Sequence, residues 1–591
     1  MATLEENYDR KDNRENKNPG GGEYYYFGKT GGEEGVQIPN RATQAKMAEN
    51  LSQKLFQNVS EKSSKYPKPE VKFTYGTAGF RLKAELLPSV MYRMGLLAVL
   101  RSRACGSKTI GLMITASHNP VQDNGVKLID PMGEMLEADW EKYATELANS
   151  DEVGKCLKDL TEQVKLKSAE WNVVGNVVVA RDTRPSGSEL AQAALDGAEA
   201  FGGKFNDLGI LTTPQLHFIV RCINDPKYGT ASEEGYYKKI SSAFVKLTKS
   251  VALSPVNVDG ANGVGAPKMS ELAKHLKNVL PVSVFNDGST GKLNENCGAD
   301  FVKVGQRGPE GVEITVGGRY VSVDGDADRI VYFYHDNSGG FHLLDGDKIS
   351  TLIASYLKEK LEESCLNLDH GLGVVQTAYA NGSSTAYLED ILNVPVACVK
   401  TGVKHLHKKA HDFDIGVYFE ANGHGTVLFS VEFKSKLEKA KQGPDLGPKK
   451  KAALEELESS MNIINETVGD AMSDMLIVEA ILSKKEWDLP TWDKCYQDLP
   501  NRQRKVQVKD RTVIVTTDAE TKTTSPQGLQ GEIDTLVAKV KKGRSFVRPS
   551  GTEDVVRVYA EAETREDADS LALAVAGKVF DLAGGVGTRP T

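Results

Sequence analysis

The sequence predicts a multidomain α/β protein: three α/β domains with mixed, largely parallel sheets, and a smaller C-terminal α+β domain, around a central cleft. The chain has 591 residues, and at roughly 100 to 200 residues per domain this length predicts about three to five domains. An apolar run, a polar turn and a helical pattern recur in that order, which is typical of α/β units with parallel strands. These units cover residues 177–201, 208–224, 256–276 and 373–388.

The segment after Lys505 follows a different order. It reads strand, strand, helix, strand, helix, which indicates a small α+β domain rather than another α/β unit. The predicted organisation begins with a disordered polar extension. It continues with three α/β domains, a charge-rich helical linker and the α+β domain. The boundaries are 1–42, 43–190, 191–312, 313–445, 446–490 and 491–591, with an acidic loop at 324–329 near the border of the second α/β domain.

Composition excludes several classes of function. The net charge of -8 and the dispersed basic residues argue against a general nucleic-acid binder. The seven cysteines include no C-x-x-C pair, which favours reduced thiols over a disulfide framework or a zinc site. No stretch approaches about 18 consecutive apolar residues, and the N-terminus lacks an apolar signal core. We therefore expect a cytoplasmic protein without a membrane or nucleic-acid partner, as a monomer or a weak homodimer.

One predicted strand is followed directly by a turn that contains a serine hydroxyl. The apolar run Ile110–Ile114 breaks into Thr115-Ala-Ser-His-Asn-Pro120, where small polar residues and a proline force a turn. Ser117 is the candidate nucleophile. His118 and Lys127 are close enough in sequence to supply the base or cation that a serine hydroxyl needs. From this loop alone, an ordinary serine or Asx turn remains the alternative.

A second loop carries three carboxylates. The segment Asp324-Gly-Asp-Ala-Asp-Arg329 joins two predicted strands, and its small residues let a tight loop turn all three aspartates inward. Such hard oxygen ligands suit Mg²⁺ or Ca²⁺. An EF-hand is excluded, because its loop requires glycine and glutamate where this chain has Arg329 and His335. A metal-free acidic turn remains the alternative, although Arg329 favours a phosphate beside a metal.

Two arginine-containing loops are candidate phosphate sites. Near the C-terminus, a guanidinium, two hydroxyls and flexible backbone amides share one turn, which suits phosphate oxygens; a capped turn is the alternative. Arg81 follows two glycines and can reach a phosphate, and a surface arginine is the alternative there. The C-terminal candidates are Arg548, Pro549, Ser550, Gly551, Thr552 and, on the next strand, Arg557.

Two further polar segments are assigned structural roles. Asp345-Gly-Asp347 is predicted to cap the N-terminus of a helix over Ile349–Leu361, with a second metal site as the alternative. Arg181 and Arg184 follow the strand at 177–180. They are assigned to a contact between domains and are not counted as site residues.

Several of these motifs carry a resemblance to a known family. Thr115–Pro120, Asp324–Arg329 and Arg548-Pro-Ser-Gly-Thr-Glu-Asp554 resemble the serine, metal and phosphate loops of the α-D-phosphohexomutases, and they occur in that family's order. Three more motifs resemble the branch of the family that acts on N-acetylglucosamine phosphates. They are Tyr75-Gly-Thr-Ala-Gly-Phe-Arg81, Thr401-Gly-Val-Lys-His-Leu-His407 and Gly416-Val-Tyr-Phe-Glu-Ala-Asn-Gly-His-Gly-Thr426.

The resemblance implies a phosphoserine enzyme. It implies that Ser117 carries the phosphate and that one Mg²⁺ is held by a phosphoserine oxygen and three aspartates. Arg329 would neutralise the transferring group. We choose Lys127, helped by His118, as the general acid/base, and a simple phosphate-binding cation is the alternative for either residue. A sugar 1,6-bisphosphate would be the activator. The implied metal ligands are Ser117, Asp324, Asp326 and Asp328.

The resemblance also implies a substrate. Glu420 and Asn422 would bind sugar hydroxyls, and the small Ala421 would leave space for a 2-acetamido group. The implied reaction interconverts N-acetylglucosamine 6-phosphate and 1-phosphate in UDP-N-acetylglucosamine biosynthesis. The alternatives are a phosphoglucomutase or phosphomannomutase, a non-catalytic sugar-phosphate-binding protein, and a phosphatase.

Overall fold

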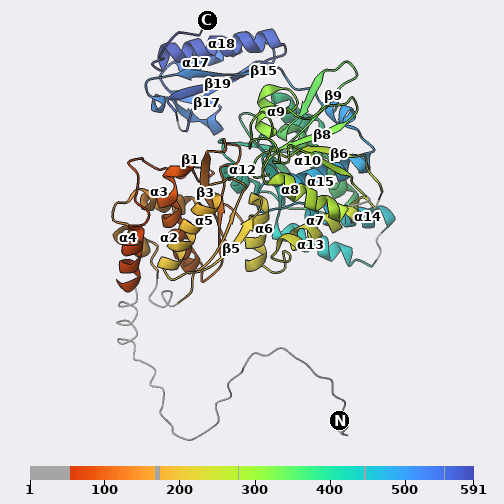
Figure 1. Cartoon of the computed structure of the whole chain (residues 1–591). Coiled ribbons are helices and arrows are strands. Elements are labelled where there is room, and N and C mark those ends of the chain that lie inside the picture. Colours follow the sequence, from red (N-terminus) through yellow and green to blue (C-terminus); the bar gives the residue numbers. More distant parts are fainter. Residues whose placement is uncertain are drawn as a thin grey trace, which may run out of the picture. The chain divides into compact units, whose positions relative to one another are not determined.

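The computed structural model describes residues 53–590, apart from 77, 167–172, 250, 277–278, 445–446 and 552. The predicted disordered extension at 1–42 and the candidate Thr552 lie outside the described residues. Four sheets of three to five strands and one two-stranded hairpin make up the strand content of the described chain (Figure 1). This mixed α/β architecture confirms the predicted fold class, and the predicted domain boundaries stay a prediction.

The first sheet has the order β1-β3-β2-β4-β5. Strand β2 pairs parallel with β4 and antiparallel with β3, so the sheet is mixed. The helix before β2 is α2, which is largely buried and packs against α5. The strands are β1 (Phe80–Lys83), β2 (Ile110–Ile114), β3 (Asp123–Ile129), β4 (Asn176–Arg181) and β5 (Lys204–Ile210), and the helices are α2 (Pro88–Ala104), α3 (Ala138–Asn149), α4 (Val153–Gln163) and α5 (Gly187–Ala200).

The second sheet has the order β10-β9-β8-β6-β7, again with both parallel and antiparallel pairs. Its strands are β6 (Val256–Asp259), β7 (Val282–Phe285), β8 (Arg319–Val323), β9 (Ile330–His335) and β10 (Phe341–Leu344). The helices of this stretch are α6 (Thr213–Asn224), α7 (Glu233–Leu247), α8 (Gly265–Leu276) and α9 (Ala299–Gly305). The aspartate loop joins β8 to β9, as the sequence predicts.

The third sheet has the order β12-β11-β13-β14. The preceding helix α10 begins after Asp345, whose side chain accepts a hydrogen bond from the Asp347 amide, so the predicted N-cap is confirmed. The strands are β11 (Leu372–Thr377), β12 (Val396–Val399), β13 (Ile415–Phe419) and β14 (Gly425–Phe429). The helices are α10 (Gly346–Ser364), α11 (Gly382–Ala386), α12 (Val403–Ala410) and α13 (Val431–Lys441).

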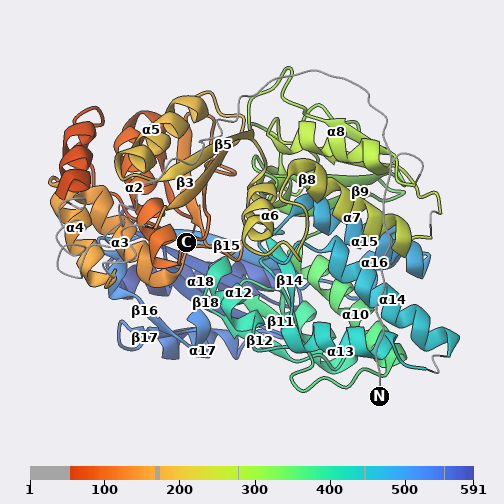
Figure 2. The same ribbon diagram turned by 90° about the horizontal axis from the view of Figure 1, so that it is seen from below.

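Three helices follow before the last sheet: α14 (Pro448–Ile463), α15 (Ala471–Lys485) and α16 (Leu489–Asp493). Helices α7, α14 and α15 lie side by side (Figure 2). Residues 471–482 of α15 are buried, and the apolar ones among them belong to the hydrophobic cluster that also includes side chains of the second and third sheets. The helices of this segment therefore contribute directly to the core.

The C-terminal part is an antiparallel sheet of order β15-β19-β18, covered on one face by α17 and α18 (Figure 1). This confirms the α+β character predicted for the C-terminal part. The observed order of three strands, a helix, two strands and a helix differs from the predicted strand, strand, helix, strand, helix, because short strands joined by tight turns do not separate in the sequence pattern. Its elements are β15 (Asn501–Gln507), β18 (Arg544–Pro549), β19 (Val555–Glu561), the hairpin β16 (Val515–Thr517) and β17 (Lys522–Ser525), and the helices α17 (Leu529–Val537) and α18 (Arg565–Leu582).

Strand ends explain how distant motifs come together. Ser117 follows the carboxyl end of β2, Asp324 follows β8 and Glu420 follows β13, one strand in each α/β sheet. Such ends are where open α/β sheets bind ligands. Among the described residues, every helix falls short of the length and apolarity that crossing a bilayer requires. All seven cysteines are free thiols.

Candidate active site

A pocket of about 660 Å³ collects side chains from the loops of all four sheets. The serine and two of the aspartates are buried beside it and do not line it. Pro549, Ser550 and Gly551 adjoin the lining residue Arg548 without lining the pocket themselves. The predicted site residues that line it are Arg81, His118, Lys127, Asp328, Arg329, Glu420, Ala421, Asn422, Arg548 and Arg557.

Ser117 sits in a strained turn. Its φ of 52° is in the left-handed region, and its backbone amide donates to Thr115 Oγ1 at 2.9 Å. A non-glycine residue in this conformation costs roughly 1 kcal/mol or more and needs surrounding contacts to hold it. The Ser117 hydroxyl is fully buried and donates to Asp324 Oδ2 at 2.7 Å. The serine and metal loops are therefore in direct contact.

The Arg184 side chain stabilises the backbone of the serine loop. This buried guanidinium donates to the backbone carbonyls of Ser117, at 3.0 Å, and Asn119, at 2.8 Å. It also donates to the carbonyls of Pro120 and Asp123 and pairs with Asp182 at 3.0 Å. The predicted contact between domains is therefore wrong for Arg184, because parallel pairing of β2 and β4 places it under the serine loop of the same sheet.

The three aspartates form a buried triad whose carboxylate oxygens lie within 4.8 Å of one another. Gly325 lets the two loops approach, since a Cβ there would lie 2.5 Å from the Ser117 carbonyl oxygen. Among the described residues, Asp326 Oδ1 and Asp328 Oδ1 are buried without a hydrogen-bond partner. Unsatisfied carboxylate oxygens around a small space are what a bound cation would need. The triad therefore fits a metal ion.

Cations surround the triad. Lys127 Nζ lies 3.1 Å from Asp326 Oδ2 and 3.0 Å from Asp328 Oδ2, and Thr213 donates to Asp326 at 2.6 Å. Burial opposes ionisation of Asp328, but Lys127 and then His424 outweigh it and hold the pKa of that carboxyl well below its usual range. Burial, followed by the charges of Asp328 and Asp326, raises the pKa of Asp324 well above its usual value.

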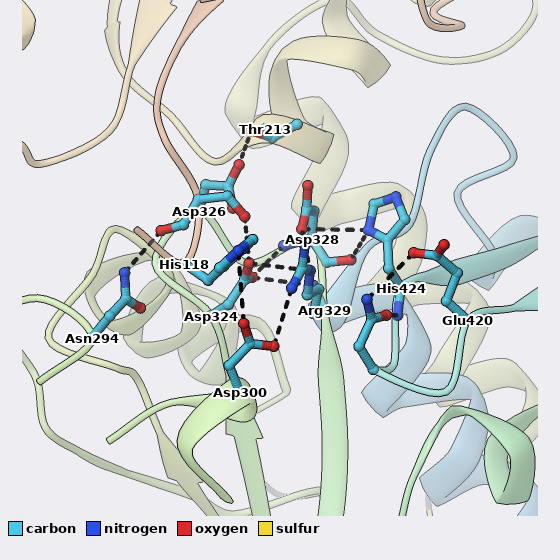
Figure 3. A network of polar contacts seen from close by, with 12 residues as sticks. His118, Thr213, Asn294, Asp300, Asp324, Asp326, Asp328, Arg329, Glu420 and His424 are labelled. Atoms are coloured by element: carbon cyan, nitrogen blue, oxygen red, sulfur yellow. Dashed lines mark hydrogen bonds and ion pairs between the residues drawn. The ribbon is translucent and has the colours of Figure 1, made fainter. Parts of the chain in front are cut away.

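Arg329 occupies the edge of the triad that faces the pocket. Its guanidinium lies 3.8 Å from Asp324 and 3.1 Å from Asp300, which projects from α9 (Figure 3). Burial and then Arg329 lower the pKa of the neighbouring His118 ring to about 4. His118 is therefore a neutral hydrogen-bonding group near neutral pH, with Arg329 and the nearby Arg81 supplying the positive charge.

The sugar loop predicted after β13 is joined to the metal loop. His424 Nδ1 lies 2.7 Å from the Asp328 carbonyl oxygen, and the Asn422 amide donates to Glu420 at 3.3 Å (Figure 3). The Ile330 amide donates to the Gly423 carbonyl at 3.1 Å. The Glu420 and Asn422 side chains therefore stand at the pocket wall on a loop fixed to the carboxylate triad.

Gly423 makes this junction sterically possible, so Gly423→Ala should destabilise the protein. Its φ is 87°, and a Cβ would lie 1.8 Å from the Ile330 carbonyl oxygen. We expect the free energy of unfolding to fall by about 2 to 4 kcal/mol, measured by denaturant titration. Gly531→Ala is the matched control, because the added methyl meets no atom within 4 Å in α17. It should stabilise by about 0.5 to 1 kcal/mol. Equal stability of the two variants would contradict the close approach.

The C-terminal arginines reach the same pocket from the last sheet. Arg548 Nε pairs with Glu520 at 3.0 Å, and Glu520 also accepts the Thr401 amide at 2.9 Å. Arg557 lines the pocket from the neighbouring strand β19, in register with Arg548. Glu520 thus connects the predicted phosphate loop to the loop before α12.

Several contacts around the serine and the pocket involve residues that were not predicted from the sequence. Asn294 donates to the Ser117 and Asn119 carbonyls at 2.9 and 3.1 Å across the junction of the first two sheets. Thr213, His424 and Glu520 were likewise not singled out. His424 lies within the quoted motif of the sugar loop, whereas Thr213 and Glu520 belong to no quoted motif. The one available signal was position, because Thr213 and Arg184 both stand just beyond the carboxyl end of a strand.

Comparison with known proteins decides the family. The models of domain II and domain III of phosphoacetylglucosamine mutase AMG1 match residues 229–331 and 345–487. Two models of phosphoglucomutase/phosphomannomutase, for the alpha/beta/alpha domain I and the C-terminal domain, match residues 97–155, 157–233 and 505–578. The human phosphoacetylglucosamine mutase is 55% identical over 543 residues, which are 90% of this chain and 98% of the human protein. This chain belongs to the phosphoacetylglucosamine mutase family.

Solved structures of this family share the fold along the chain. Aspergillus fumigatus N-acetylphosphoglucosamine mutase in complex with GlcNAc-6P and magnesium is 46% identical with a TM-score of 0.86, over 90% of this chain and 99% of that one. A serine-to-alanine variant of the Aspergillus enzyme in complex with glucose 1,6-bisphosphate is 47% identical, with a TM-score of 0.85 and the same coverage. As a member of the phosphoacetylglucosamine mutase family, the chain is an enzyme, an isomerase that acts as an intramolecular phosphotransferase.

Proposed function

We propose that this enzyme interconverts N-acetylglucosamine 6-phosphate and N-acetylglucosamine 1-phosphate through a phosphoserine at Ser117. The observation that carries the proposal is the direct contact of Ser117 Oγ with Asp324, 2.7 Å away in the buried carboxylate triad. A nucleophile beside a cation-binding site, next to a pocket lined by arginines and a sugar loop, is suited to phosphoryl transfer. The magnesium and sugar phosphates bound by the Aspergillus relatives support this assignment.

In the proposed reaction, neither the phosphoryl group of Ser117 nor the phosphate of the sugar is lost to water. The phosphoserine P–O bond breaks as a free sugar hydroxyl attacks the phosphorus and loses its proton, and the product is a sugar 1,6-bisphosphate. The bisphosphate turns around, and Ser117 Oγ takes the other phosphoryl group from it. The released monophosphate is the isomer, and the serine is phosphorylated again. A sugar 1,6-bisphosphate from solution can load the serine in the same way, which explains its proposed role as activator.

The chain's own residues have separate tasks in this scheme. Asp324, Asp326 and Asp328, with a phosphoserine oxygen, would hold one Mg²⁺, which supplies positive charge beside the transferring phosphoryl group. Arg329, against the triad, neutralises charge on the same group. Lys127 and His118 line the pocket, and we assign them the proton transfer. Arg184 and Asn294 position the serine through its backbone carbonyl.

Binding of the non-reacting phosphate is assigned to the C-terminal loop, with Arg81 as a further phosphate contact. Arg548→Ala should therefore raise KM for the sugar phosphate by about 10- to 100-fold, since a charged hydrogen-bonding pair is lost. Ser117 should still be phosphorylated by a sugar bisphosphate added in excess. Steady-state kinetics and intact-protein mass spectrometry measure both.

Arg502→Ala is the matched control for this variant. Arg502 lies in β15 of the same sheet, but its exposed side chain pairs with Asp569 of α18 at 3.0 Å. Its KM should be unchanged. Failure of Arg548→Ala to accept phosphate at any bisphosphate concentration would contradict a role limited to substrate binding.

Ala421 is the proposed determinant of the 2-acetamido group. It lines the pocket between Glu420 and Asn422, which are assigned to the sugar hydroxyls. Ala421→Leu should lower kcat/KM for N-acetylglucosamine 6-phosphate by about 10-fold more than for glucose 6-phosphate, because added bulk takes the space of the acetyl group. Parallel assays with the two substrates measure the ratio. Equal losses would show that Ala421 does not read the acetamido group.

The direct test of the substrate assignment compares sugar phosphates with the wild-type enzyme, Mg²⁺ and a trace of sugar 1,6-bisphosphate. Preference for N-acetylglucosamine 6-phosphate supports the proposal, and preference for glucose or mannose phosphates would replace it by a phosphoglucomutase or phosphomannomutase activity. Within this proposal the enzyme is cytoplasmic, is a monomer or weak homodimer, and provides the 1-phosphate for UDP-N-acetylglucosamine biosynthesis.

A further inference from the structure

A second set of metal-ligand side chains lies outside the aspartate triad. It consists of Glu134, His407 and His411, whose ligand atoms all lie within 4.8 Å of one another. We refer to these three residues as the His-Glu cluster. Glu134 belongs to the turn after β3, whereas His407 lies on α12 and His411 directly follows it. The cluster therefore joins a turn of the first sheet to a helix that packs on the third.

Both histidines direct their Nε2 atoms toward the Glu134 carboxylate. His407 Nε2 and His411 Nε2 each lie 3.7 Å from Glu134 Oε1. Residues four apart on a helix lie on one face, and the two rings have their centroids 5.0 Å apart. With ligand bonds of about 2.0 to 2.1 Å, tetrahedral zinc places neighbouring ligand atoms about 3.4 Å apart. Small side-chain rotations are enough to reach that geometry.

The buried ring of His407 gives a second indication, besides the clustering, that a ligand binds here. It is only 6% exposed, and its Nε2 has no hydrogen-bond partner among the described residues. Its other ring nitrogen, Nδ1, lies 2.9 Å from the Tyr418 hydroxyl. With the proton on Nδ1 donated to Tyr418, the lone pair of Nε2 faces Glu134. A second hydrogen bond that fixes the tautomer in this way is usual for metal-bound histidine.

We propose that the His-Glu cluster binds Zn²⁺ through His407 Nε2, His411 Nε2 and Glu134. Two imidazoles and one carboxylate form a ligand set that suits zinc and leaves a fourth position for water. His411 is exposed, so solvent reaches that position. The site is separate from the aspartate triad, which offers only hard oxygen ligands and suits Mg²⁺.

Zinc at this position would tie together two parts of the pocket wall. Leu128 and Met135, on the Glu134 side, line the pocket, and so do Val403 and Lys404 at the start of α12. Lys404 already donates to the Leu136 carbonyl at 3.2 Å across the same boundary. Bound zinc therefore restricts separation of these two segments. Turnover that requires a bisphosphate to reorient in the pocket should slow when zinc is bound.

Zinc titration of the full-length enzyme tests the site. The protein is kept in excess Mg²⁺, and its zinc affinity is measured by competition with a chromophoric chelator. We expect one zinc per chain in the wild type and in Asp326→Asn. His411→Ala and Glu134→Gln should bind zinc more weakly, by more than the 10- to 100-fold typical of losing a second-shell partner.

The matched control is His405→Ala, an exposed histidine on the same helix but outside the cluster. It should bind zinc as the wild type does. Absence of tight zinc binding in the wild type, equal weakening by His405→Ala and His411→Ala, or loss of all zinc in Asp326→Asn would each overturn the proposal.

Turnover provides a second readout, which rests on the proposed mutase activity whereas the binding experiment does not. Zinc at the measured affinity should slow the wild type and His405→Ala, and the inhibition should be lost in His411→Ala. Equal inhibition of His411→Ala would place the inhibitory zinc elsewhere and overturn the coupling of the cluster to the pocket.

Discussion

Ser117→Ala is expected to abolish isomerisation of N-acetylglucosamine 6-phosphate, with kcat lowered by about 10⁴-fold or more. Under the proposed mechanism no other group can store the phosphate between the two transfers, so the loss should not be rescued by more substrate or more bisphosphate. The folded state should be little affected. Alanine removes a buried hydroxyl that, within the described part of the chain, donates its side-chain hydrogen bond to Asp324, and the backbone contacts of Arg184 and Asn294 remain.

The measurement is a coupled assay of 1-phosphate formation, with the unfolding temperature as the check on folding. Ser89→Ala is the matched control, because Ser89 is also a buried serine and its hydroxyl has no hydrogen-bond partner among the described residues. It should retain full activity. Appreciable isomerisation by Ser117→Ala would contradict the assignment of the nucleophile.

Asp326→Asn is expected to produce the second largest loss, with turnover lowered by about 10²- to 10³-fold. Asparagine keeps the shape of the side chain and can still accept the hydrogen bond from Thr213, but it removes one of three negative charges from the triad. Metal affinity should fall along with turnover. Titration with Mn²⁺, followed by electron paramagnetic resonance, measures binding independently of activity.

Asp345→Asn is the control for the metal titration. Asparagine is as good an N-cap as aspartate, so α10 should be retained, and Asp345 belongs to the acidic pair considered as a second metal site. Its Mn²⁺ affinity should equal that of the wild type. If Asp345→Asn lost the metal and Asp326→Asn kept it, the ion would belong to the second acidic pair and the mechanism would have to be redrawn.

Local motifs were the part of the site that the sequence could predict. Ser117, Asp324 and Glu420 each follow a short apolar strand, and a strand that breaks into polar residues is visible without knowledge of tertiary contacts. The cap at Asp345 was predictable for the same reason. The strand, turn and helix rhythm also predicted the α/β sheets, since its period depends on neighbouring residues alone.

Contacts that depend on strand pairing could not be predicted from the sequence. Arg184 reaches Ser117 because β2 and β4 are parallel neighbours, although 67 positions separate the two residues. Asn294 reaches the same carbonyl across 177 positions. The local pattern places Arg184 near the end of a strand, but for neither residue does it distinguish a buried positioning group from a surface one. The same holds for Glu520, which becomes important only because the last sheet brings Arg548 to the pocket.

The phosphoserine mechanism is tested most directly by asking whether Ser117 itself gains and loses phosphate. The wild-type enzyme would be incubated with a sugar 1,6-bisphosphate and Mg²⁺, desalted, and examined by peptide mass spectrometry before and after addition of N-acetylglucosamine 6-phosphate. We expect one phosphoryl group on Ser117 that passes to the added sugar. A phosphate on another residue, or a phosphoserine that does not transfer to the sugar, would contradict it.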